Sequence, residues 1–180
     1  MRARFIIASM AALVLFGACS VAQDKTAPDT AALIAAALIM PDRPQSQVQR
    51  DATRNPAELL KFSGIGPGDQ VADFGAGGGY FSRLLSALVG PNGKVIVQNP
   101  PSWIEQYKSI SPALKTLGTD RANISVLTAK LDDPGLPVGA LDAVTMMLIY
   151  HDAVLLPTDR AKMNAAIFAA LKPGGRFLVT

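Results

Sequence analysis

One stretch of the chain, residues 71–80, constrains the fold more than any other. It runs from an apolar, strand-like segment through Asp73 into a loop with four glycines in five positions, and a helical pattern starts directly after it. Glycine tolerates positive φ and lets a ligand approach the backbone, and a helix N-terminus offers free N–H groups. A tight turn alone would need fewer glycines, so the segment predicts a ligand-binding loop.

The sequence after this loop continues to alternate between strand and helix patterns. Strands are predicted at residues 70–74, 94–98, 124–128, 141–149 and 176–179, and helices at 80–89, 103–107, 113–117 and 159–171. Turns rich in Pro and Gly precede the first, second and last strands, the last of them at residues 172–175. Such alternation predicts right-handed βαβ units on a parallel sheet, an α/β doubly wound, Rossmann-like fold.

Two common phosphate-binding motifs do not match the glycine loop. In the dinucleotide fingerprint G-x-G-x-x-G counted from Gly75, the last glycine would fall on Tyr80, and no Gly-Lys-Ser/Thr follows for a P-loop. The pattern that fits is D-x-G-x-G-x-G at residues 73–79. It resembles motif I of the class I S-adenosylmethionine (SAM)-dependent methyltransferases.

The resemblance extends over residues 41–180. Residues 94–99 match the second strand of that fold, 141–144 its fourth strand, and 171–177 the turn before its fifth. A narrower similarity, to an exported bacterial subgroup of predicted methyltransferases, rests on three motifs: Asp51-x-x-Arg54-x-Pro56-x-Glu58, Gly77-Gly78-Gly79-Tyr80-Phe81 and Tyr150-His151-Asp152. The resemblance implies a three-layer sheet with five parallel strands in the order 3-2-1-4-5. Strands 6 and 7 of the complete fold are missing, so we expect a piece of a longer chain.

The same resemblance implies SAM as the cofactor and gives roles to particular residues. Its methionine part would lie on the loop, and Asp73 would orient its amino group. The loop residues concerned are Gly75, Gly77, Gly78 and Gly79. Asn99 stands where the family has an acid that binds both ribose hydroxyls, and a neutral amide lacks charge-assisted pairing. Asp132 or Asp133 would contact the adenine amine, unless both belong to a solvated turn.

Tyr150 and His151 are the candidate catalytic residues, expected at the end of the fourth strand and facing the acceptor. His151 is the only histidine, and imidazole, which titrates near neutral pH, can remove a proton from a hydroxyl or amine. The alternatives are a histidine that caps or packs under the loop and a tyrosine that stacks on the ligand or packs on the sheet. Methyl transfer can also proceed by positioning alone.

Three further features have two interpretations each. Trp103 and Tyr107 either line the acceptor pocket or, at helical spacing, belong to the core. Arg54 and Glu58, four residues apart, form a pair over the site or a pair on the surface. The apolar segment 31–40 is too short to span a membrane and is expected to be a packed helix.

The N-terminus has the layout of a bacterial export signal. Residues 1–18 combine two arginines with a short apolar run and small residues. The sequence around Cys19 resembles a lipobox, which implies a lipid anchor on Cys19, whereas residues 20–22 offer a rival cleavage site that would leave a soluble exported protein. Either way the chain is expected in the cell envelope, with a tether at 19–30, a helical lead-in at 31–63 and the α/β domain at 64–180.

Charge and cysteine content exclude several classes of protein. A single cysteine excludes a disulfide scaffold and a cysteine-based zinc cluster, and no metal site is expected. The formal charge of +3 falls to +1 without Arg2 and Arg4, so nucleic-acid binding is not expected. The predicted function is methyl transfer from SAM to a small-molecule acceptor. The alternatives are an exported binding or structural domain that retains only the fold, and a nucleotide-linked oxidoreductase, which the broken fingerprint disfavours.

Overall fold

A computed structural model describes residues 29–180. The expected export signal, Cys19 and all but the last two residues of the tether lie outside the described residues. In chain order the elements are α1 (Thr30–Leu38), α2 (Gln45–Val48), α3 (Asp51–Arg54), α4 (Pro56–Ser63), β1 (Gln70–Phe74), α5 (Tyr80–Val89), β2 (Lys94–Asn99), α6 (Pro101–Gln106), α7 (Ile110–Asp120), β3 (Ile124–Thr128), β4 (Leu141–Met146), α8 (Tyr150–Leu155), α9 (Arg160–Ala170) and β5 (Leu171–Val179).

The five strands form one parallel sheet in the order β3-β2-β1-β4-β5, which confirms the predicted fold class. The chain adds β2 and β3 on one side of β1 and then crosses back to add β4 and β5 on the other. The order therefore reverses between β1 and β4. Ligands of open α/β sheets bind beyond the carboxyl ends of the strands at such a reversal, which is where the glycine loop lies.

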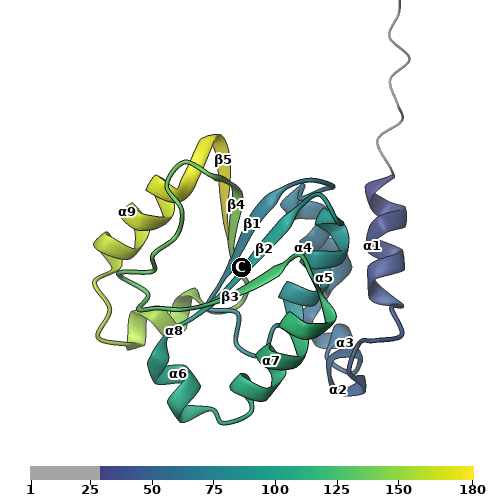
Figure 1. Ribbon diagram of the computed structural model, residues 1–180, viewed down its shortest axis with the longest axis horizontal. Helices are drawn as coiled ribbons and strands as arrows, with labels where there is room; N and C mark the ends of the chain where they lie inside the picture. The colour runs from purple at the N-terminus through teal and green to yellow at the C-terminus, as the bar shows by residue number, and fades with distance from the viewer. Residues whose placement is uncertain (1–28) are drawn as a thin grey trace, which may run out of the picture.

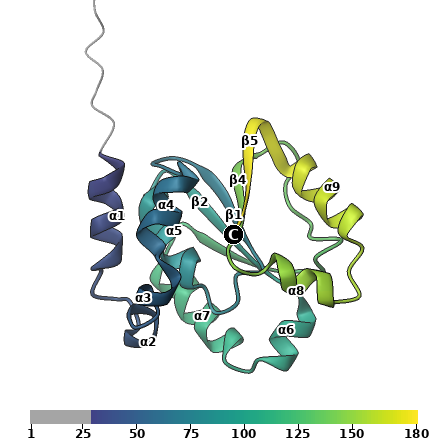
Figure 2. The same ribbon diagram turned by 180° about the vertical axis from the view of Figure 1, so that it is seen from behind.

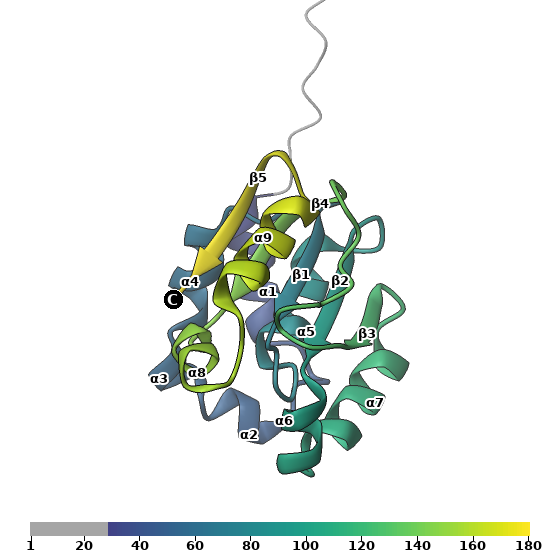
Figure 3. The same ribbon diagram turned by 90° about the vertical axis from the view of Figure 1, so that its left-hand side faces the viewer.

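Helices cover both faces of the sheet (Figures 1 and 2), and each face has its own apolar core. Along β1, Val71 packs into the core beneath α1, α4, α5 and α7, while Ala72 and Phe74 pack into the core beneath α8 and α9. This division follows from the period of two along a strand, which sends successive side chains to opposite faces. Figure 3 shows α2, α3, α6 and α8 gathered at one end of the sheet.

Helix α5, which follows the glycine loop, is the most enclosed of the described helices. Its predicted apolar stripe is confirmed, since Phe81, Leu84, Leu85, Leu88 and Val89 are all buried. The opposite side of α5 is covered as well, because α1 packs against it. A strand-to-helix unit held on both sides gives the loop at its start a rigid support.

The helical lead-in is divided more finely than the sequence pattern predicts. The expected helix at 31–40 is α1, and α4 begins at Pro56. Between them, however, Asn55 takes a left-handed conformation with φ 46° and separates α3 from α4. A proline directly after it also disfavours continued helix at this residue. Arg54 and Glu58 therefore belong to different helices.

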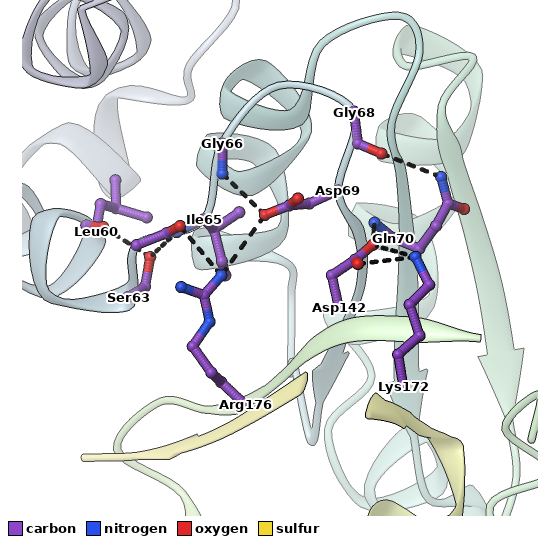
Figure 4. A network of polar contacts seen from close by, with 11 residues as sticks. Leu60, Ser63, Ile65, Gly66, Gly68, Asp69, Gln70, Asp142, Lys172 and Arg176 are labelled. Atoms are coloured by element: carbon purple, nitrogen blue, oxygen red, sulfur yellow. Dashed lines mark hydrogen bonds and ion pairs between the residues drawn. The ribbon is translucent and has the colours of Figure 1, made fainter. Parts of the chain in front are cut away.

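The last strand begins earlier than predicted. Leu171 already pairs with Leu141, and Arg176 pairs with Ala143, so the expected turn at residues 172–175 is an irregularity inside β5. Two contacts hold it (Figure 4): the Lys172 Nζ atom donates to both Asp142 carboxylate oxygens at 2.7 and 2.8 Å, and the Arg176 guanidinium donates to the Gly64 carbonyl at 3.1 Å. The Pro-Gly-Gly signal marked a real break in regular structure, but the ladder resumes on both sides of it.

Candidate functional site

The loop between β1 and α5 has the backbone that its glycines predict. Gly75, Gly77 and Gly79 have φ of 70°, 57° and 77°, in the left-handed region that other residues rarely adopt. Gly79 is the N-cap of α5 and supplies no side chain to cap the first N–H groups of the helix. Apart from the Ser82 N–H, which hydrogen-bonds to Asp73, those groups lie at the carboxyl end of β1, where a ligand can accept hydrogen bonds from them.

The end of β2 holds the loop in this shape. The Asn99 Oδ1 atom accepts from the Gly77 N–H at 2.8 Å, and its Nδ2 atom donates to the Gly77 carbonyl at 3.0 Å. Gln98 acts in the same way one residue earlier, accepting from the Gly75 N–H at 3.1 Å and donating to the Ala129 carbonyl at 2.7 Å. Both amides are fully buried. Asn99 thus lies at the loop, as expected, but its polar atoms are engaged by Gly77.

Asp73 is a buried carboxylate directly in front of the loop. It accepts hydrogen bonds from the Ser82 hydroxyl at 2.6 Å and the Thr145 hydroxyl at 3.2 Å. Burial raises the pKa of Asp73 to about 6, and these two hydrogen bonds, with a third from the Ser82 backbone N–H, oppose the shift without cancelling it. A carboxyl group with such a pKa is a site where a positively charged ligand group would be favourable. Ser82 and Thr145 lie 9 and 72 residues from Asp73, and no sequence motif predicts either contact.

A cavity of about 200 Å³ opens over the loop. It joins four of the predicted site residues, Asp73, Gly75, Gly77 and Gly78, to parts of the chain that lie far away in sequence. The remaining lining residues come from the loop itself, α3 and the residue before it, the start of α5, and the segment after β4. They are Ala76, Arg50, Arg54, Tyr80, Phe81, Met147, Leu148 and Ile149. Gly79 does not line the cavity and acts as the helix cap.

The glycines of the loop differ in what surrounds them. A side chain at Gly75 would come within 3.2 Å of the Trp103 ring and 3.3 Å of the Ile149 side chain, so the backbone is already tightly covered there. At Gly77 a Cβ atom would meet nothing within 4 Å. The open approach to the loop is therefore over Gly77. Trp103 is a core residue that touches the loop, and Tyr107 is exposed, so neither lines this cavity.

The structure corrects the expected position of Tyr150 and His151. Strand β4 ends at Met146, and Leu148 takes a left-handed conformation with φ 57° that turns the chain before α8 begins at Tyr150. The His151 side chain is 70% exposed, with Asp152 at 3.6 Å, and does not line the loop cavity. Tyr150 lies in a different cavity of about 500 Å³ beside α9 and β5, where its hydroxyl accepts from the Asn164 amide.

Asp132 lies at the same end of the sheet as the loop, but in a second cavity of about 460 Å³. This cavity lies between Pro100 and Pro101, which follow β2, and residues 130–132, which follow β3. One Asp132 oxygen accepts from the backbone N–H of Asp159 at 3.2 Å. Asp133 does not line either cavity at this end.

Tyr80, the first residue of α5, connects the loop to the lead-in helices. Its hydroxyl donates to Asp51 at 2.5 Å, and Asp51 is held by two hydrogen bonds from the Arg43 guanidinium at 2.6 and 2.8 Å. The hydrogen bond from Arg43 holds the pKa of Asp51 below its ordinary value even though burial opposes this. The predicted Arg54–Glu58 pair is absent from the ion pairs of residues 29–180 because of the break at Asn55.

No group of His, Cys, Asp and Glu side chains within residues 29–180 is arranged to hold a metal ion. No helix in the same range is long and apolar enough to cross a membrane.

Comparison with known proteins identifies the fold. No protein-family model matches the chain. Over 127 residues it is 28% identical to the ubiquinone/menaquinone biosynthesis C-methyltransferase UbiE of Vibrio campbellii, covering 67% of this chain and 44% of that protein. The chain therefore spans less than half the length of this relative.

Solved structures of SAM-dependent methyltransferases superpose on this chain. A SAM-dependent methyltransferase from Aquifex aeolicus superposes with a TM-score of 0.61 at 24% identity, covering 73% of this chain and 65% of that one. Phosphoethanolamine N-methyltransferase 2 of Haemonchus contortus, solved in complex with SAM, superposes with a TM-score of 0.55 at 20% identity, covering 69% and 27%. The described part of the chain has the Rossmann-like fold of the SAM-dependent methyltransferases.

Proposed function

We propose that this chain is a SAM-dependent methyltransferase that acts on a small-molecule acceptor. The observation that carries the proposal is the loop of left-handed glycines at the reversal of strand order, which opens onto a cavity beside the buried carboxyl group of Asp73. The similarity to a C-methyltransferase and the fold likeness to SAM-dependent enzymes support it.

The residues at this end of the sheet fit the parts of the cofactor. The methionine part would lie over Gly77 and Gly78, where the backbone is open, with its ammonium group toward Asp73. The adenine part would occupy the cavity of about 460 Å³ that Asp132 lines, between the segments after β2 and β3. When bound, SAM supplies an electrophilic methyl group on a positively charged sulfonium.

The chain's own contribution is positioning and the exclusion of water. The acceptor would enter along Met147, Leu148 and Ile149, which give the cavity an apolar rim. His151 lies outside the cavity in this structure, so transfer would depend on holding the acceptor in line with the methyl group. Leu148 keeps a left-handed backbone at this rim, and such strain is concentrated at functional sites.

The test compares two glycine variants that each place a side chain at positive φ. Gly77 and Gly68 both have positive φ and both have free space for a Cβ atom, but Gly68 precedes β1 at the opposite end of the sheet. We expect wild type to bind SAM in calorimetric titration and Gly77→Ala to bind about tenfold or more weakly, a loss of about 1.4 kcal/mol. Gly68→Ala should lose similar stability and bind as wild type does. Because Trp103, the only tryptophan, contacts Gly75, its fluorescence should report the same binding.

Two results would count against the proposal: no SAM binding by wild type, or equal binding by the two glycine variants. The alternative is a domain that retains the fold without catalysis, and the engagement of Asn99 by Gly77 favours it, since no acid is left at this position for the ribose. SAM binding without any formation of S-adenosylhomocysteine in the presence of envelope extract would support this alternative.

We also propose that the chain is exported and attached to the membrane through a lipid on Cys19. The proposal rests on the sequence of residues 1–20 alone. Full-length protein expressed in a bacterium should label with radioactive palmitate, and Cys19→Ser should not. Labelling that persists in the variant, or recovery of the wild type only in the cytosol, would contradict it.

A further inference from the structure

Two arginines meet over one aromatic ring at the loop cavity. The guanidinium groups of Arg50 and Arg54 lie 5.4 and 5.5 Å from the centroid of the Tyr80 ring, and all three residues line the cavity. A guanidinium that stacks on an aromatic ring has a restricted orientation. The two positive groups are thus held at the edge of the proposed methyl-transfer site.

Neither arginine is neutralised by the chain around it. Arg43 also lies near the Tyr80 ring, at 5.8 Å, but Asp51 pairs with it. The oxygens of Asp51 are used by Arg43 and by the Tyr80 hydroxyl. Across residues 29–180, the ion pairs and side-chain hydrogen bonds of the structure include no partner for the guanidinium of Arg50 or Arg54.

The two positive charges disfavour each other. Burial lowers the pKa of Arg54, and the charge of Arg50 lowers it further. A bound SAM would add a third positive charge at its sulfonium. An anionic group in the cavity would relieve this repulsion, and it would form charge-assisted hydrogen bonds with guanidinium groups that are already oriented.

We propose that Arg50 and Arg54 form a subsite for a carboxylate or phosphate group of the methyl acceptor, an inference that rests on the proposed methyltransferase function. The forked guanidinium matches the geometry of both anions. The apolar rim at Met147 and Ile149 lines the same cavity and suits the uncharged part of such an acceptor. The carboxylate of SAM itself has the same chemistry, so the experiment must separate the two sources.

Inorganic phosphate is the probe. It is titrated calorimetrically into the full chain, first alone and then in the presence of saturating SAM. Phosphate should bind in both cases, because the subsite belongs to the acceptor. The double variant Arg50→Gln/Arg54→Gln should bind it at least about tenfold more weakly, as expected for lost charge-assisted hydrogen bonds. Arg54→Lys, which keeps the charge, should fall between wild type and the double variant.

Arg160→Gln is the matched control, since Arg160 is exposed at the start of α9 and does not line the loop cavity. It should bind phosphate as wild type does. Equal phosphate binding by wild type and the double variant would overturn the proposal. Phosphate that is displaced by SAM but not by decarboxylated SAM would overturn it as well, because the arginines would then hold the carboxylate of the cofactor.

If the methyltransferase proposal is wrong but the anion subsite exists, the titrations give a different result. A wild type that binds phosphate through Arg50 and Arg54 but never binds SAM would refute the methyltransferase proposal and leave an anion site whose ligand is not a methyl acceptor. Circular dichroism and Trp103 fluorescence of each variant should match those of wild type. A double variant that fails to fold would be replaced by the two single Gln variants, each with a smaller expected loss of phosphate binding.

Discussion

The two ends of the parallel sheet are built from similar residues. They differ in whether the charged side chains have partners within the chain. Both ends have glycines, arginines and an aspartate next to β1 or β4. At the amino end, Asp142 accepts from the Gln70 N–H at 2.8 Å and from Lys172, and Arg176 donates to Gly64 and lies 3.8 Å from Asp69 (Figure 4). At the carboxyl end, Arg50 and Arg54 face a cavity instead of a carboxylate.

The two aspartates show the same contrast in their titration. Burial alone would raise the pKa of Asp142, but the hydrogen bonds from Gln70 and Lys172 outweigh burial and hold the pKa below its ordinary value. Asp73 accepts from the hydroxyls of Ser82 and Thr145 and from the Ser82 backbone, but these contacts do not outweigh burial, which raises its pKa to about 6. One end of the sheet uses its polar groups to hold the register of β1, β4 and β5. At the other end, the raised pKa of Asp73 and the two arginines at the cavity are features that cluster at functional sites.

Glycine-to-alanine substitutions at the two ends should give the largest difference in the free energy of unfolding. At Gly93, before β2, a Cβ atom would come within 2.7 Å of the Val89 carbonyl and 2.8 Å of the Asp69 carbonyl, and backbone cannot easily move away. Gly93→Ala should therefore lower the free energy of unfolding by more than about 3 kcal/mol. Urea unfolding, followed by Trp103 fluorescence, measures this change.

Gly78→Ala is the counterpart at the carboxyl end. Gly78 does not have positive φ, and a Cβ atom there would meet only Ala113, at 3.7 Å. The unfolding free energy of Gly78→Ala, measured by the same urea unfolding, should stay within about 0.5 kcal/mol of wild type, because the added methyl group has room beside Ala113. A Gly78→Ala protein as unstable as Gly93→Ala would mean that both ends are packed alike.

The fold class and the glycine loop could be predicted from the sequence, because both depend on local patterns. The alternation of strand and helix patterns predicted a parallel sheet, the stripe along residues 80–89 predicted the helix after the loop, and the glycines at 75–79 predicted a ligand-binding loop. The strand order followed only from the resemblance to the class I methyltransferases, and the structure has that order. The position of Asp73, Gly75, Gly77 and Gly78 around one cavity also follows from these patterns. Each of these signals lies within about ten residues of the feature that it predicts.

The partners of the loop could not be found in this way. Asn99 binds Gly77 across 22 residues and Asp51 binds Tyr80 across 29, and neither pairing has a local pattern. Tyr150 and His151 were placed wrongly because the apolar run 141–149 looks continuous, while the left-handed Leu148 ends the strand region inside it. A leucine carries no sequence signal for such a conformation.

The pH dependence of stability provides a smaller effect that distinguishes the two aspartates. The pKa of Asp73 is about 6 in the folded chain, above its ordinary 3.8, so the folded state binds this proton more tightly than the unfolded state. The contribution to stability is therefore present at low pH and lost as pH rises through 6, by about 2 kcal/mol between about pH 4.5 and about pH 7. Asp73→Asn removes this titration, so the difference in unfolding free energy between wild type and Asp73→Asn should change by that amount over this range.

Asp142 should behave in the opposite way, because its folded-state pKa is lowered. Its contribution to stability is present above about pH 4 and is lost only as pH falls below that value. Asp142→Asn should therefore leave the change in unfolding free energy between about pH 4.5 and about pH 7 as it is in wild type.

Saturating SAM provides a further test at Asp73. A bound ammonium group next to Asp73 would favour the ionised carboxylate and lower the pKa of Asp73. With SAM bound, the unfolding free energy of wild type should therefore change less between about pH 4.5 and about pH 7. The pH dependence of the unfolding free energy of Asp73→Asn should be the same with and without SAM. An identical pH dependence of wild type with and without SAM would mean that the ammonium group does not lie at Asp73, and the cavity over the loop would then hold another part of the ligand.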